Sequence, residues 1–168
     1  MNPGEHILQF RSDAMDPEEV LDDLLGELKL RNYSVTRVNN IDSIYQREST
    51  PPGSLEFSFY KIVEFCNLES CSRIIAADLL SGVFMPARFL VFRETGSSES
   101  VLAFLKPTAF AELFDSSVMM GLAKTLEEDM QQISEEIIGY SQLQIGLFSD
   151  LAIPLYFRNP FCASPKSA

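Results

Sequence analysis

The hydrophobic positions of this chain change repeatedly between the two-residue period of a strand and the period of about 3.6 residues that marks a helix. The clearest change follows residues 57–65, which are rich in aromatic and β-branched side chains, because Cys71, Ile74 and Ile75 then share one helix face. A strand followed by a helix is therefore predicted. Asn67 stands at the junction, where its side-chain oxygen can cap the helix by accepting from a first-turn N–H group.

The same pattern divides the rest of the chain, as far as residue 138, into further strands and helices. Asp16, Pro17 and Glu19 have the spacing of an N-cap, a first helical residue and a capping box. Two prolines and a glycine within 49–54 interrupt regular structure and predict a loop inside one domain. The expected strands are 6–10, 33–38, 57–65, 83–94 and 100–106, and the expected helices are 17–30, one that follows Asn67, and 118–138.

The order of these elements is strand, helix, strand, strand, helix, strand, strand, helix. Hairpins mixed with helices are typical of an α+β fold, so we expect a five-stranded, largely antiparallel sheet with the helices packed on one face. A single domain is expected over residues 1–140. Residues 141–168 are apolar but interrupted by prolines, and are expected to form an extension that packs on the domain or on a dimer partner.

Composition narrows the classes of function. The chain has 168 residues, 46% of them hydrophobic, with a net charge of −11 and a pI of about 4.5. So acidic a chain is a poor general binder of nucleic acid, whose phosphates need clustered Lys and Arg. No apolar run reaches the roughly 18 residues that a membrane span needs, so no membrane insertion and a cytoplasmic location are expected. Three cysteines, an odd number, favour reduced thiols over a disulfide framework.

Two short motifs carry a resemblance to a known family. One is Phe65-Cys66-Asn67-Leu68 at the end of a strand, and the other is Phe84-Met85-Pro86-Ala87 before the next strand. The segment resembles the bacterial and archaeal family called domain of unknown function 302, in which a Cys-Asn-Pro or Gly-Asn-Pro turn precedes a helix and a Leu-Pro-Cys follows it. The turn proline and the second cysteine are absent here. The resemblance extends over about 6–138 and implies a TATA-binding-protein-like α+β fold, but no settled activity.

Cys66 is the candidate catalytic residue. It directly precedes a helix N-terminus, where the helix dipole can favour a thiolate, so it could act as a nucleophile or carry a persulfide. The alternative is a small buried apolar residue. A metal site with Cys71 has the wrong spacing for a zinc knuckle, and His6 is the only histidine of the chain. The acidic run 127–129 reads as a solvated helix face, and neither a metal nor a cofactor is expected.

Basic side chains suggest a different kind of site. Lys61, Arg88, Arg93 and Lys106 each interrupt an apolar strand, so together they could gather an anionic small molecule. The alternative is cross-strand ion pairing with acidic neighbours, for which the candidates are Glu64, Glu94 and Glu99. The candidate ligand-binding residues are Tyr60, Lys61, Asn67, Arg88 and Lys106.

The sequence leaves three functions open. The favoured one is a homodimeric module that binds a small ligand or a protein partner in a groove between the sheet and its helices. The second is a thiol-dependent enzyme or sulfur carrier that uses Cys66. The third is an adaptor that uses the apolar extension at 141–168. The sequence favours a binding protein over an enzyme, and it identifies neither a ligand nor a reaction.

Overall fold

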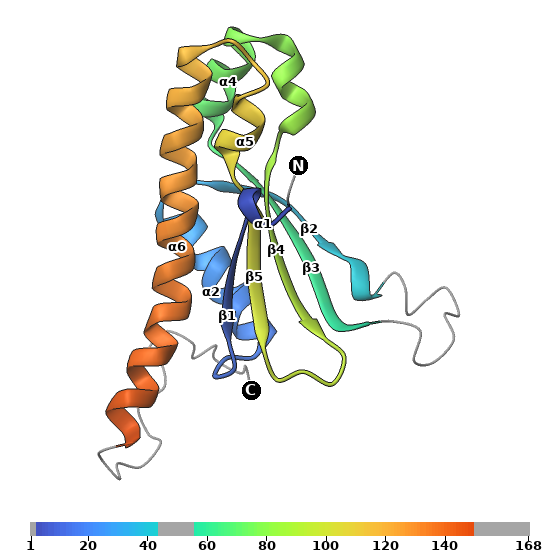
Figure 1. Ribbon diagram of the computed structural model, residues 1–168, viewed down its shortest axis with the longest axis vertical. Helices are drawn as coiled ribbons and strands as arrows, with labels where there is room; N and C mark the ends of the chain where they lie inside the picture. The colour runs from blue at the N-terminus through green and yellow to red at the C-terminus, as the bar shows by residue number, and fades with distance from the viewer. Residues whose placement is uncertain (1–2, 44–55, 150–168) are drawn as a thin grey trace, which may run out of the picture.

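The computed structural model describes residues 3–43 and 56–149, with side chains up to residue 139. Five strands of these residues form one antiparallel sheet in the order β1-β5-β4-β3-β2 (Figure 1). The strands are β1 (Ile7–Ser12), β2 (Ser34–Asn40), β3 (Phe57–Cys66), β4 (Ala87–Glu94) and β5 (Ser100–Leu105). The helices are α1 (Pro3–His6), α2 (Pro17–Leu30), α4 (Leu68–Ala77), the 3-10 helix η1 (Leu79–Phe84), α5 (Pro107–Ala111) and α6 (Ser117–Ser149).

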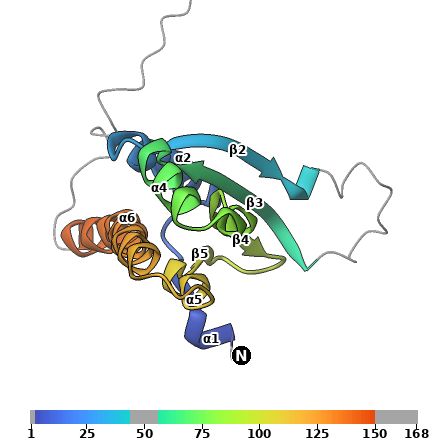
Figure 2. The ribbon, with the colours of Figure 1, turned by 90° about the horizontal axis from the view of Figure 1, so that it is seen from above.

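Two helices cover one face of the sheet. Figure 2 shows α2 and α6 on the same side of the curved strands. Alternate side chains of the strands meet them there, because successive residues of a strand point to opposite faces. The main core contains Phe59, Val63 and Phe65 of β3, Phe89 and Val91 of β4, Leu102 and Phe104 of β5, Val20, Leu24 and Leu28 of α2, and Met130, Ile133, Ile137 and Ile138 of α6.

The fold confirms the predicted α+β class and the five-stranded antiparallel sheet, and α2 and α6 cover one face of it as predicted, whereas the helix after Asn67, α4, lies in a second core at the end of the sheet. One strand boundary is wrong. The strand predicted at 83–94 begins only at Ala87, because the residues before it form η1. The Asp78 side chain caps η1 by accepting from the Leu80 N–H at 2.7 Å, and Pro86, which follows a cis peptide bond, directly precedes the strand.

Three further helical segments differ from the sequence prediction. Helices α1 and α5 were not predicted, although Pro107 at the first turn of α5 is a common start signal. Helix α6 continues to Ser149, beyond the predicted end at 138. The division into 1–140 and 141–168 stays a prediction, and both the loop predicted at 49–54 and the prolines of the extension lie outside the described residues.

Both predicted helix caps are present. The Glu19 carboxylate accepts from the Asp16 N–H at 3.3 Å, which completes the capping box of α2. The Asn67 side chain accepts from the Ser70 N–H at 3.1 Å and caps α4. These contacts satisfy backbone donors of the first turn that have no partner inside a helix.

Polar contacts fix α6 against its neighbours. The Tyr33 hydroxyl donates to Asp129 at 2.6 Å, and the Thr108 N–H and hydroxyl both donate to Glu127, at 3.1 and 2.6 Å. Burial, with the Asp129 contact adding to it, raises the pKa of Tyr33 above its ordinary value. The acidic run predicted as a solvated face is therefore partly structural, because two of its three carboxylates hold other elements onto α6.

A second, smaller core lies at the end of the sheet. It joins α4, α5 and the first turns of α6 through Ile74, Ala111, Met119 and Ala123. The Phe84 ring of η1 stacks on Phe110 with ring centroids 5.1 Å apart. We call α4, η1, α5 and this end of α6 the upper lobe, which Figure 1 shows above the strands. No helix among residues 3–43 and 56–149 is long and apolar enough to cross a bilayer.

Candidate functional site

A hollow of about 320 Å³ opens where the sheet meets the upper lobe. Its roof comes from η1 and α5, through Val83, Phe84 and Phe110. Its floor comes mainly from the face of the sheet that α2 and α6 leave uncovered. At the ends of the strands the hollow also touches residues of the main core. The other lining residues are Ile7, Tyr60, Ile62, Ala87, Arg88, Phe89, Leu90, Ala103, Phe104 and Leu105 of the strands, Pro86 before β4, Pro107 at the start of α5 and Met130 of α6.

Two polar side chains interrupt this apolar lining. Among the described residues around the hollow, Arg88 and Tyr60 alone carry hydrogen-bonding groups on their side chains. Nε of Arg88 lies 3.3 Å from a Glu64 oxygen, and 59% of the Arg88 side chain is exposed. The two Nη groups have no other ion-pair partner in the described part of the chain. A guanidinium held in this way can bind a carboxylate or a phosphate through its outer nitrogens.

Tyr60 is positioned by aromatic neighbours. Its ring lies 4.9 Å from that of Phe57 and 6.0 Å from that of Phe92, measured between centroids. Its backbone N–H donates to Asp42 at 3.1 Å, which fixes this point of β3. The phenol is therefore held on the helix-free face of the sheet. Tyr60 lies on β3, and Arg88 lies on the neighbouring strand β4. Tyr60 and Arg88, two of the five predicted ligand-binding residues, line the hollow, and their role in binding stays a prediction.

The other predicted ligand-binding residues lie elsewhere. Lys61 donates to Asp42 at 2.7 Å, and its ammonium lies 5.0 Å from the centroid of the Phe59 ring. Lys106 donates to the Glu5 carbonyl at 2.9 Å, and Asn67 caps α4. None of these three side chains lines the hollow.

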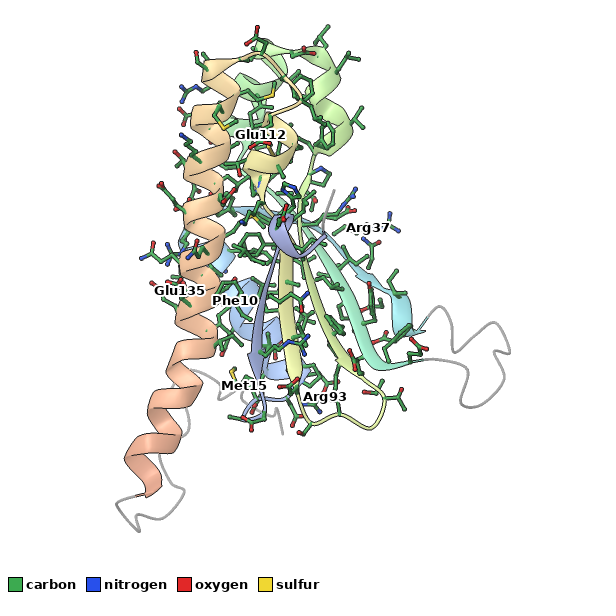
Figure 3. All side chains as sticks on the ribbon, in the orientation of Figure 1. Phe10, Met15, Arg37, Arg93, Glu112 and Glu135 are labelled. Carbon is green, nitrogen blue, oxygen red and sulfur yellow. A yellow bond between two sulfur atoms is a disulfide. The ribbon has the colours of Figure 1, made fainter. Side chains whose placement is uncertain are left out.

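The four strand cations therefore do not gather around one anion as the sequence suggested. Arg93 lies at the opposite end of the sheet, where it pairs with Asp16 at 2.9 Å and donates to the Met15 carbonyl at 3.1 Å (Figure 3). Of the predicted cross-strand pairs, Arg88 with Glu64 is present. Glu99 instead pairs with Arg11 of β1 at 2.9 Å.

The Asp42 carboxylate, just after the end of β2, accepts several hydrogen bonds. Burial acts to raise its pKa, but hydrogen bonds from Lys61, the Tyr60 N–H and the Ser43 N–H, together with the charge of Lys61, outweigh burial and lower the pKa below its ordinary value. The side chains of Lys61 and Asp42 are only 14% and 9% exposed. This pair anchors the end of β2 to β3 and is structural.

Cys66 and Cys71 are joined by a disulfide bond, and their Cα atoms are 6.7 Å apart. The expectation of reduced thiols is therefore wrong for these two cysteines in this structure. Cys66 ends β3, and Cys71 lies in the second turn of α4. Both side chains are half-buried, so neither belongs to a closed core.

No group of three or more His, Cys, Asp or Glu side chains in the described part of the chain could hold a metal ion. Within the described residues, the two candidate sites considered are the hollow and the cysteine pair. They are close along the sheet, because Phe65, next to Cys66, pairs with Ala87, and Ala87 lines the hollow.

Sequence reasoning missed the roof of the hollow and the partner of Cys66. The Phe84–Phe110 contact joins η1 to α5, two short elements that carry little periodic signal. The position of Cys71 one turn into a helix, just after Cys66, is a local signal for this pairing, but the two cysteines were considered together only as metal ligands.

The antiparallel sheet, with helices on one face and an apolar hollow at its end, defines a small α+β protein. The family model described as domain of unknown function DUF302 matches residues 8–137, and the chain belongs to that family. It is similar in fold to the structure described as an uncharacterized conserved protein DUF302 from Bacillus stearothermophilus, with a TM-score of 0.68 and 19% identity over 77% of this chain and 96% of that chain. No curated protein matches this chain.

Proposed function

We propose that the protein binds a small apolar molecule with one anionic group in the hollow beneath η1 and α5. The observation that carries this proposal is an apolar cavity whose polar side-chain groups, among the described residues, are one guanidinium and one phenol. Ligand sites are usually concave and mostly apolar, with a few polar groups that fix the orientation of the ligand. The arrangement at the end of this sheet has that character.

The size of the hollow limits the ligand. Its volume of about 320 Å³ lies at the lower end of the range of roughly 300–1,000 Å³ that is common for small-molecule sites. The apolar part of the ligand would pack between the Phe84 and Phe110 rings and the strand residues Leu90 and Ala103. A medium-length alkyl chain or a single ring fits these dimensions better than a dinucleotide.

The charge of the ligand follows from Arg88. Its Nε is already paired with Glu64, so the ion pair orients the guanidinium and leaves the outer nitrogens for a second anion. The chain as a whole carries a net charge of −11, which repels anions at long range. A preference for anionic over cationic ligands would therefore have to come from the local site.

Octanoate and octylammonium are matched probes for this proposal, because they differ mainly in the sign of the head group. We expect octanoate to shift the backbone amide resonances of Leu90, Ala103 and Phe84 in two-dimensional NMR titrations, and octylammonium to bind more weakly. Arg88→Gln should weaken octanoate binding about tenfold, since a hydrogen bond to a charged group is worth about 1.5 kcal/mol.

The matched control is Arg11→Gln, which removes a similarly exposed guanidinium that pairs with Glu99 at the other end of the sheet. Its affinity for octanoate should equal that of the unmodified protein. If Arg88→Gln and Arg11→Gln bind octanoate alike, or if the shifted resonances lie away from the hollow, the proposed site is wrong.

We also propose a homodimer, formed through the apolar surface of the upper lobe. Large apolar side chains are mostly exposed there, namely Leu79, Leu80, Val83, Leu113 and Val118. Exposed apolar surface marks interaction sites, and most soluble oligomers are assembled from copies of one chain. Sedimentation at micromolar concentration should show a dimer that Leu80→Glu converts to a monomer. A monomer before substitution would refute the dimer.

Two earlier expectations remain predictions. A cytoplasmic location is one of them. The other is an adaptor role for residues 141–168, whose side chains lie outside the described part of the chain.

A further inference from the structure

The disulfide between Cys66 and Cys71 closes a short loop, since the two residues are five positions apart. A cross-link stabilises a fold mainly by restricting the unfolded chain, and the effect grows with the length of the loop. This bond spans one strand–helix junction and connects no distant parts of the chain. Its contribution to holding the domain together is therefore small.

Other contacts hold the same junction without the bond. The Asn67 side chain caps α4 through the Ser70 N–H, and the Ser81 hydroxyl donates to the Ile74 carbonyl at 3.3 Å. Ile74 is buried against Ala111 and Met119 in the smaller core. The junction can therefore stay folded when the two cysteines are reduced, which a reversible redox pair requires.

The two sulfurs are also placed for exchange with a small disulfide. Both residues are partly exposed, so neither lies inside a closed core. Cys66 directly precedes the N-cap of a helix of 10 residues, where the helix dipole favours a thiolate. Once Cys66 has formed a mixed disulfide with a small molecule, Cys71 supplies the second thiol that resolves it.

We infer that Cys66 and Cys71 form a reversible dithiol–disulfide couple that exchanges with low-molecular-weight disulfides. The Cys66 thiolate attacks one sulfur of the small disulfide, releases one thiolate and forms a mixed disulfide. The Cys71 thiolate then attacks the Cys66 sulfur and releases the second thiolate. The two cysteine sulfurs lose two electrons, the small disulfide gains them, and the two cysteine protons end on the released thiols. The reverse sequence reduces the pair.

The test uses the full chain with Cys162→Ser, so that the third cysteine cannot react. The protein is equilibrated with mixtures of reduced and oxidised glutathione, quenched, labelled with N-ethylmaleimide and weighed intact. We expect Cys66 and Cys71 both to be labelled with excess reduced glutathione, neither with excess oxidised glutathione, and full return when the mixture is reversed. Circular dichroism should show the same folded protein in both states.

Single substitutions identify the order of attack. Cys71→Ser should accumulate one glutathione on Cys66, because the resolving thiol is gone, and Cys66→Ser should lose most of that adduct. Octanoate binding by both variants should be retained, which separates this test from that of the hollow. The inference fails if the pair stays unlabelled with excess reduced glutathione, or if both cysteines stay labelled with excess oxidised glutathione. It also fails if Cys66→Ser gathers as much adduct as Cys71→Ser.

Discussion

Phe65→Ala is expected to lower the free energy of unfolding by about 3–5 kcal/mol, through lost apolar burial and the cavity that truncation leaves. Phe65 is fully buried between the sheet and its covering helices. Its ring meets Tyr33 edge to face and stacks on Phe89, with centroids 5.3 Å apart in both pairs. Both partner rings are held in place, because Phe89 lies in β4 and Tyr33, which directly precedes β2, donates its hydroxyl to Asp129.

Urea denaturation monitored by circular dichroism measures this effect, with the redox state of the cysteines held constant. The matched control is Leu68→Ala, only three residues away, where the side chain is 75% exposed. That substitution should change the free energy of unfolding by less than about 0.5 kcal/mol. Equal effects at the two positions would contradict the described packing of the sheet against α2 and α6.

Asp42→Asn is expected to cost about 3 kcal/mol of stability at neutral pH, because it leaves the Lys61 ammonium largely buried without its counter-charge. The value is at the low end for a broken buried pair, since 14% of the Lys61 side chain reaches solvent and can be hydrated. The control is Glu99→Gln, which breaks the exposed Arg11–Glu99 pair. An exposed pair of that kind contributes about 0–1 kcal/mol.

The pH dependence of the Asp42 effect has a definite sign. The folded protein lowers the pKa of Asp42, so its contribution to stability is complete above the ordinary aspartate pKa of about 3.9 and is lost as the pH falls through the lower folded value. The difference in unfolding free energy between the unmodified protein and Asp42→Asn should therefore shrink below about pH 4. A difference that stays constant down to pH 2 would show that the carboxylate charge is not what stabilises this pair.

Local signals in the sequence were enough for the sheet and the two main helices. The run of aromatic and β-branched residues at 57–65 predicted a strand, and the caps at Asp16 and Asn67 predicted where helices begin. Each of these signals depends on neighbours within a few residues. They were confirmed because the tertiary structure uses the faces that the pattern already separates.

The site could be predicted only in part, because it depends on contacts between distant segments. Tyr60 and Arg88 were selected as polar interruptions of apolar strands, and the structure brings both to the hollow. Lys61 showed the same signal, but alternation along β3 places it on the face opposite Tyr60, where Asp42 binds it. The roof of the hollow joins residues of η1 and α5 that are 26 positions apart at the Phe84–Phe110 contact (110 − 84 = 26). No local pattern encodes such a contact.

The most direct test of the proposed function is to locate a ligand in the hollow. Crystals of the protein grown with 8-bromooctanoate would show the bromine by its anomalous scattering. The account predicts a bromine peak between the Phe84 and Phe110 rings and the strand floor, with the carboxylate at the Arg88 guanidinium. A bromine peak elsewhere on the protein, with the hollow empty in the same crystals, would contradict it.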